Sequence, residues 1–251
     1  MLPHEPRRRA SLAVISLSLL VLLGNAAAPD APLARLVSTE DLALVKNGET
    51  VVRRKSAGGR VETMVAAKID APPSWVYAQI RDACHLDNST AYSGAPRYFA
   101  ATEAESAVAA ARGEMERAEV EKLRAITCTE AVAAPTAFSF TTWDLPFPLS
   151  DGWSFTRITR TPAGSSGGII RTMQVAGTLS HLEYHTDVVP LDGGTLLVAL
   201  SVFEIPFSVP TFMLSSTDQS SKHVVTIRDR AKAAPWKSSA AADQPRSDAG
   251  K

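Results

Sequence analysis

Two long strand-like segments joined by a glycine-containing turn constrain this chain more than any other feature. The first segment reads HLEYHTDVVP, the turn is LDGG at residues 191–194, and the second segment reads TLLVALSVFEI. Asp-Gly and Gly-Gly pairs readily adopt the backbone angles of a tight hairpin turn. The sequence therefore predicts a long antiparallel hairpin, in which successive side chains alternate between the two faces of a sheet.

The first of these strands carries histidines and acids at every second position. His181, Glu183, His185 and Asp187 would project together from one face, and the residues between them from the other. Three such side chains could ligate zinc and leave one position for water. The alternatives are a solvated or a pH-sensitive strand face. Because burying four such groups without partners would cost several kcal/mol, we expect them to face solvent and assign no metal ligand.

The first 28 residues are interpreted as a signal peptide or an N-terminal anchor. Arg7, Arg8 and Arg9 precede an apolar run at residues 11–24, and small residues follow it. This order is typical of an export signal, and the run is shorter than the roughly 20 apolar residues that a membrane span needs. We expect an exported protein, periplasmic or extracellular, or one that is anchored in the membrane through an uncleaved N-terminal segment.

Composition narrows the function further. The chain has 251 residues, enough for one good core, and 26 basic against 26 acidic side chains. Because the net charge is zero, the chain has no overall positive field, and nucleic acid is not an expected partner. Cys84 and Cys128 are the only cysteines. In an oxidising compartment they could form a disulfide, or they could be two separate buried thiols.

Periodicity and turn residues predict an α+β fold, because a sheet that is apolar on one face needs a helix to cover it. Residues 29–39 are expected to be a linker, and residues 236–251 a disordered tail. Helices are predicted from Pro72 onward, over 103–125 and from Pro210 onward. Strands are predicted at 42–54, 60–70, 125–132, 136–145, 152–164, 167–179, 181–189 and 195–205.

Several segments resemble the START-like helix-grip superfamily, also called SRPBCC, in its bacterial polyketide cyclase/dehydrase and lipid-transport branch. The matching segments are AAKIDAPPSWVYAQIRD, DLPFPLSDGW and VVPLDGGTLLVALSVFEIPFSVP with the helix after it. The resemblance covers residues 40–235, and the helical segment 103–125 is an insert in it. It implies a curved antiparallel sheet wrapped around a long C-terminal helix, with an apolar cavity between them.

The resemblance implies a protein that binds or carries a hydrophobic small molecule, such as a lipid, in that cavity. A monomer in transient contact with a membrane is expected, without a cofactor. The alternative is an enzyme of the cyclase or dehydratase type that acts on a polyketide-like substrate in the same cavity. No catalytic residue is assigned, because no glycine-rich phosphate loop, serine nucleophile elbow or paired-carboxylate signature is present.

The resemblance also implies which residues face the ligand. In relatives, residues at even offsets before the hairpin proline face the cavity, which would place Leu182, Tyr184 and Thr186 inside. Aromatic residues and a methionine near the turn at 144–153 and the last helix would complete the wall, because ligand sites are mostly apolar with a few polar anchors. The predicted ligand-binding residues are Tyr92, Phe140, Trp143, Trp153, Phe155, Leu182, Tyr184, Thr186, Phe212 and Met213.

Overall fold

The computed structural model describes residues 33–82, 84, 95–112, 114–143, 152–204 and 216–233. For Trp143 and for residues 216–220 it describes the backbone alone. The described residues belong to one compact unit that begins at Pro32. The predicted signal peptide at 1–28 and the predicted tail at 236–251 lie outside the described residues.

The described strands form one antiparallel sheet, in the order β1-β2-β9-β8-β7-β6-β5-β3-β4. Strand β8 lies in the middle of the sheet, and the predicted LDGG turn joins it directly to β9, with Leu191 opposite Gly194. The strands are β1 (Thr50–Ala57), β2 (Arg60–Ile69), β3 (Arg97–Ala100), β4 (Ala125–Ile126), β5 (Thr136–Trp143), β6 (Gly152–Pro162), β7 (Gly168–Gly177), β8 (His181–Leu191) and β9 (Gly194–Glu204).

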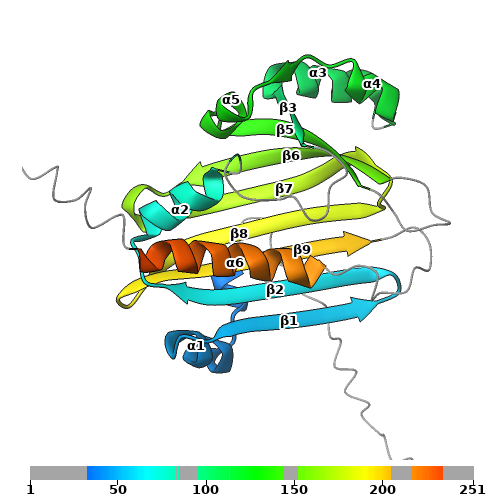
Figure 1. Ribbon diagram of the computed structural model, residues 1–251. Coiled ribbons are helices and arrows are strands. Elements are labelled where there is room, and N and C mark those ends of the chain that lie inside the picture. Colours follow the sequence, from blue (N-terminus) through cyan, green and yellow to red (C-terminus); the bar gives the residue numbers. More distant parts are fainter. Residues whose placement is uncertain are drawn as a thin grey trace, which may run out of the picture. The chain divides into compact units, whose positions relative to one another are not determined.

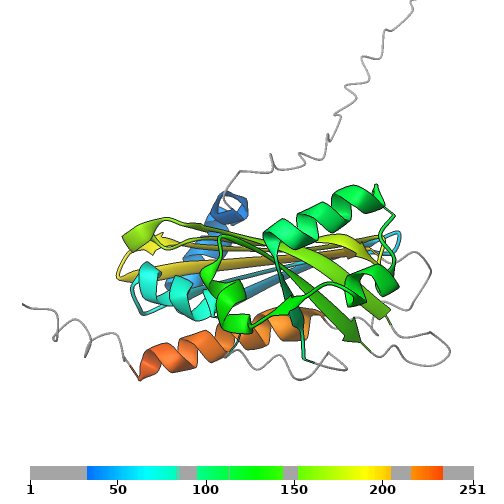
Figure 2. The same cartoon turned by 90° about the horizontal axis from the view of Figure 1, so that it is seen from above.

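Helices cover both faces of this sheet, as the two views in Figures 1 and 2 show. We call inner the face that carries α2, α5 and α6, and outer the face that carries η1, α1, α3 and α4. The helices are η1 (Leu33–Leu36), α1 (Thr39–Lys46), α2 (Pro73–Arg81), α3 (Ala101–Ala111), α4 (Arg117–Glu121), α5 (Cys128–Ala133), η2 (Gly164–Ser166) and α6 (Ser216–Lys232).

The C-terminal helix α6 lies over β9 and β2 on the inner face and runs along them (Figure 1). Its buried Val224, Ile227 and Ala231 pack with Val65 and Leu197 in one core cluster. The predicted α+β class, with a curved antiparallel sheet around a long C-terminal helix, is confirmed.

Two local strand predictions were wrong, and capping residues explain both of them. Residues 42–46 are helical because Ser38 accepts a hydrogen bond from the Asp41 N–H and acids occupy the first turn. The predicted strand 125–132 is mostly helix α5, because Thr127 and Glu130 form a capping box. The predicted linker 29–39 contains η1, whose Leu33 is buried against the outer face.

The predicted helix over 103–125 is also corrected. It is split into α3 and α4, with Arg112 in the left-handed region between them. Ala104 of α3 and Val120 of α4 are fully buried against the outer face. Strand β3, at Arg97–Ala100, was not predicted.

The polar side chains of strand β8 share one face, as predicted, but they are less exposed to solvent than predicted. The four polar side chains do project from the outer face, but His185 and Asp187 are buried, at 5% and 0% exposed. The His185 Nε2 and Asp187 Oδ1 atoms lie 2.8 Å apart, an ion-pair distance without hydrogen-bond alignment. Asp187 Oδ2 accepts a hydrogen bond from the Ala34 N–H at 3.3 Å. Segment η1 therefore covers the pair that was expected to face water.

Replacing Asp187 with alanine should lower the free energy of unfolding by about 3 kcal/mol, because it leaves His185 buried without its partner and frees the Ala34 N–H. Glu183→Ala is the matched control. It removes an acid from the same face of the same strand, but the His181–Glu183 pair, at 3.4 Å, is partly exposed and should contribute less than about 1 kcal/mol. Urea unfolding at pH 7 measures both changes, and equal losses would contradict the buried role of Asp187.

Candidate functional site

The centre of the inner face is only partly buried, although it lies on the middle strands of the sheet. Ile158, Thr172 and Tyr184 lie opposite one another on β6, β7 and β8. Ile170, Thr186 and Ala199 form the next row on β7, β8 and β9. We call these residues and Gln174 the inner-face patch; all of them are intermediate in exposure. A helix that covered this surface fully would have buried it.

The inner-face helices lie around this patch. Helix α6 packs over β2 and β9, and α2 packs over β7, β8 and β9 through Val76 and Tyr77. Helix α5 packs against Tyr98 and Ala137 at the β3–β5 side of the sheet. A disulfide joins Cys84, just after α2, to Cys128 at the start of α5. It settles the state of the two cysteines, which the sequence left open, and it links two of the helices that border the patch.

Buried hydroxyl groups surround the patch. Ser139 and Thr156 form a hydrogen bond of 2.8 Å between β5 and β6. Thr63 and Ser201 are fully buried on the opposite side, and the Thr63 Oγ1 atom has no hydrogen-bond partner among the described residues. The Gln174 amide donates to the Leu179 carbonyl at 2.6 Å, while its buried Oε1 atom finds no donor in the described part of the chain. The inner face is thus more polar than the apolar cavity that the resemblance implies.

A buried cation lies at one side of the patch. Arg160 of β6 is 7% exposed and sits opposite Ile170. Its Nη1 donates to the Ala134 carbonyl at 3.1 Å, and its Nε atom is buried without a partner among the residues that the structure describes. Burial lowers the pKa of Arg160, an effect that the neighbouring Tyr77 and Tyr98 oppose and Arg81 reinforces.

Tyr77 and Tyr98 approach this cation from different elements. Tyr77 extends from α2, and its ring packs so closely on β7 that a Cβ atom at Gly168 would lie 2.6 Å from it. Burial raises the pKa of Tyr77, and Arg81 and Arg160 offset part of that rise. Burial also raises the pKa of Tyr98 on β3, again against the charge of Arg160. Both phenols are therefore neutral hydrogen-bond donors at pH 7.

The structure brings three of the predicted ligand-binding residues together. Leu182, Tyr184 and Thr186 lie on the inner face of β8, as the hairpin register implied. Leu182 is buried in a cluster with Val61 and Phe203, and Tyr184 and Thr186 belong to the inner-face patch.

Three other predicted residues lie on the wrong face for that patch. Phe140, Trp153 and Phe155 point to the outer face, where they form an aromatic cluster. The rings of Phe138 and Phe155 stack at 5.2 Å, and those of Phe140 and Trp153 are 6.0 Å apart. Helices α3 and α4 cover this cluster. We therefore leave these three residues out of the site.

The remaining predicted site residues are not placed. The backbone of Trp143 lies at the end of β5, opposite Gly152, but its side chain lies outside the described residues. Tyr92, Phe212 and Met213 also lie outside the described residues.

The polar part of the candidate site, above all Arg160, Tyr77 and Tyr98, was not predicted from the sequence. A signal was present in the strand GWSFTRITR. Its aromatic residues alternate with Ser154, Thr156, Ile158 and Arg160, and so only one of the two sets can face the ligand. Extending the hairpin register across β7 to β6 would have selected the set that ends in Arg160.

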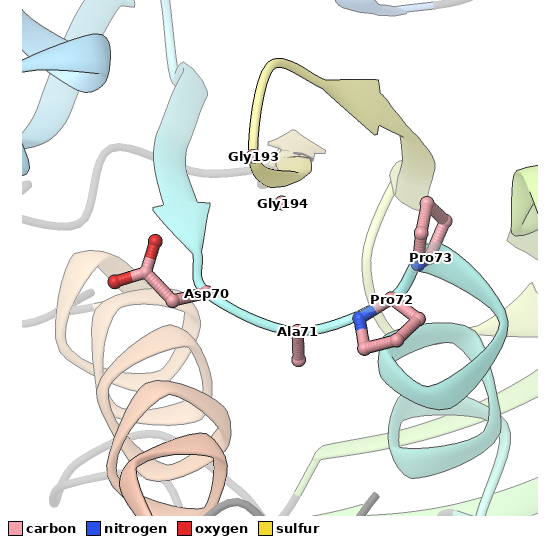
Figure 3. A pocket seen from close by; sticks show the side chains of 6 residues that line it. All are labelled: Asp70, Ala71, Pro72, Pro73, Gly193 and Gly194. Atoms are coloured by element: carbon pink, nitrogen blue, oxygen red, sulfur yellow. The ribbon is translucent and has the colours of Figure 1, made fainter. Parts of the chain in front are cut away.

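A small open depression lies elsewhere, at the edge of the hairpin (Figure 3). It measures about 290 Å³ and lies between the end of β2, the start of α2 and the β8–β9 turn. Its walls are largely backbone and proline rings, and its acid, Asp70, pairs with Lys68 at 3.5 Å. Because ligand sites usually occupy 300–1,000 Å³ with converging polar groups, we do not assign it a ligand. The residues that line it are Asp70, Ala71, Pro72, Pro73, Gly193 and Gly194.

Two further observations concern the described residues alone. Among them, no group of three or more histidine, cysteine, aspartate or glutamate side chains is placed to hold a metal ion. None of the helices within the described ranges is long and apolar enough to cross a membrane.

No protein-family model matches this chain, and no curated protein matches its sequence. Several solved structures are similar in fold. A Thermus thermophilus protein, TTHA0849, is 14% identical over 69% of this chain and 99% of its own, with a TM-score of 0.43. Human STARD10 is 10% identical over 80% and 83%, with a TM-score of 0.42. The Zhui aromatase/cyclase of Streptomyces sp. R1128 is 12% identical over 70% and 88%, with a TM-score of 0.36.

At such identities and TM-scores these matches do not assign a function, which we propose from this chain's own residues.

Tyr77 and Tyr98 should ionise later than ordinary tyrosines when the folded protein is titrated, because burial favours their neutral forms and raises each pKa. Absorbance at 295 nm measures this, and Tyr77→Phe and Tyr98→Phe should each remove a component above about pH 10. Because the folded pKa is raised, the associated stability is fully present below about pH 10 and is lost as the pH rises through the folded pKa. Titration of every tyrosine near the ordinary pKa, in protein that circular dichroism shows to be folded, would contradict this placement.

Proposed function

We propose that this chain is an exported START-like protein that binds or carries a hydrophobic small molecule of the lipid class. The observation that carries the proposal is the inner-face patch. It lies in the middle of the sheet, is partly accessible, and is bordered by α2, α5 and α6. A ligand that lies against Ile158, Ile170 and Thr186 would complete the burial that the helices leave unfinished.

The driving force for such binding is desolvation. Each methylene group of a ligand that moves from water to an apolar surface gains about 0.8 kcal/mol. The patch offers isoleucine, alanine and threonine methyl groups for this contact, with hydroxyl groups at its rim. Affinity should therefore depend on the apolar area of the ligand, and the rim should select ligands that carry polar groups at defined positions.

Export is the second part of the proposal. It rests on the order of arginines, apolar run and small residues at the N-terminus. A disulfide between Cys84 and Cys128 suits an oxidising compartment such as the periplasm or the extracellular space. A carrier in that position would exchange its lipid through transient contact with a membrane.

A second candidate is an enzyme of the cyclase or dehydratase type, for which the partly buried His223 of α6 is the titratable group to test. Such an enzyme needs a group that can accept a proton at the working pH. Tyr77 and Tyr98 do not meet this need, because their raised pKa values keep them protonated. His223 of α6 is neutral at pH 7, since burial lowers its pKa, and it would be the proton acceptor to test.

Tyr184→Asp should reduce the amount of lipid that copurifies with the protein by about tenfold or more, because it places a charge in the middle of the patch. Met173→Asp is the matched control. Met173 lies on the neighbouring strand opposite Glu183, faces outward and is 47% exposed, so this change should leave lipid retention unaltered. Native mass spectrometry, followed by extraction of the ligand, measures both. Equal retention in the two variants would contradict binding at the inner face.

A further inference from the structure

Within the part of the chain that the structure describes, Arg160 is a buried positive charge without a negative partner. Its side chain is more than nine-tenths buried, yet the only hydrogen bond that it makes to a described residue is the one to the Ala134 carbonyl. A guanidinium group has five N–H donors, and the buried Nε of Arg160 is among those that find no described acceptor. Buried charges in proteins are normally paired with an opposite charge. This exception calls for an acceptor that the described residues do not provide.

The described surroundings of Arg160 are suited to a bound anion. The Oη atom of Tyr77 is buried without a hydrogen-bond partner among the described residues, and Tyr77 is close enough to Arg160 to influence its charge. Arg81 adds a second positive charge nearby. No described carboxylate pairs with Arg160 or is among the charges that act on it. The site thus presents a guanidinium fork and a phenol donor and has a positive potential.

We propose that Arg160 and Tyr77 bind the oxyanion head group of an amphiphilic ligand, a carboxylate or a phosphate monoester, whose apolar body lies along the inner-face patch. This inference rests on the proposed binding function and specifies its ligand class. The planar guanidinium group can donate two parallel hydrogen bonds to either head group, and the phenol of Tyr77 supplies a further donor. The head group would neutralise the charge that the fold leaves buried.

The sheet register supplies the direction of the apolar body. Arg160, Ile170, Thr186 and Ala199 lie opposite one another on the consecutive strands β6, β7, β8 and β9. Three strand spacings of about 4.8 Å give a track roughly 14 Å long that leads away from the charge. Apart from Arg160, this row carries aliphatic, methyl or short hydroxyl groups, so a medium-length acyl chain fits its chemistry.

Isothermal titration calorimetry with three probes that share one chain length tests the proposal. Dodecanoate and dodecyl phosphate carry the two head groups, and methyl dodecanoate is the neutral control. The protein should bind at least one of the two anions about tenfold or more tightly than the ester, and the stronger anion identifies the head group. Arg160→Met should remove this preference and leave ester binding within about threefold. Arg157→Met, on the outer face of the same strand and paired with Glu105, should leave the preference intact.

The outcomes separate this inference from the function on which it rests. Ester binding equal to that of both anions in the unaltered protein would overturn the head-group site while the binding function stands. No binding of any probe would overturn both. A lower melting temperature of Arg160→Met, with the anion preference retained, would show that Arg160 is structural and overturn the proposal.

If Arg160→Met does not fold, a second variant tests the same site. Tyr77→Phe keeps the ring that packs on Gly168 and removes only the phenol oxygen. It should still reduce anion binding about threefold or more, because one hydrogen bond to a charged head group is lost. Unchanged anion binding by this variant would count against the site.

Discussion

The packing of α2 and α6 against β2, β8 and β9 is the interaction on which the other features depend. It buries Val65, Ile69, Val188 and Leu197 at one part of the inner face, and this apolar contact is the main source of stability for a sheet covered by helices. Because α2 and α6 pack over that part of the inner face, they do not fully cover the middle of β6, β7 and β8, which remains partly accessible. The candidate site is thus a consequence of where the core is filled.

The position of the candidate site also depends on the covering of the sheet by helices on both faces. In a sheet with one solvated face, aromatic residues mark the buried side, and alternation alone assigns the faces. Here α3 and α4 bury Phe138 and Phe155 on the outer face, while the inner face of the same strands carries Ser139 and Thr156. The more hydrophobic face of β5 and β6 is therefore the face opposite the candidate site. Only the cross-strand register shows that Tyr184 shares a face with Ile158 and Arg160 of β6.

The covering of both faces explains which parts of the fold and of the candidate site could be predicted from the sequence. The hairpin at 191–194, the helix after Pro72 and the α+β class followed from local turn and capping chemistry, and the orientation of Leu182, Tyr184 and Thr186 followed from the family register. The burial of His185 and Asp187 could not be predicted in this way, because Asp187 contacts Ala34, a residue 153 positions away in the chain. The helix at 39–46 could have been predicted, since Ser38 and Asp41 form a recognisable cap, but Leu42 and Leu44 alternate as they would in a strand.

The two faces of β8 show how one strand can serve stability and binding at once. On its outer face, His185 and Asp187 pair with each other, and Asp187 holds η1 through the Ala34 N–H. On its inner face, Tyr184 and Thr186 lie in a surface whose neighbouring cation, Arg160, finds no acid among the described residues. Polar groups buried with partners stabilise a fold, whereas polar groups buried without them cost free energy unless something else binds there. The side of β8 that shares its face with Arg160 is for that reason the one to which we assign the ligand.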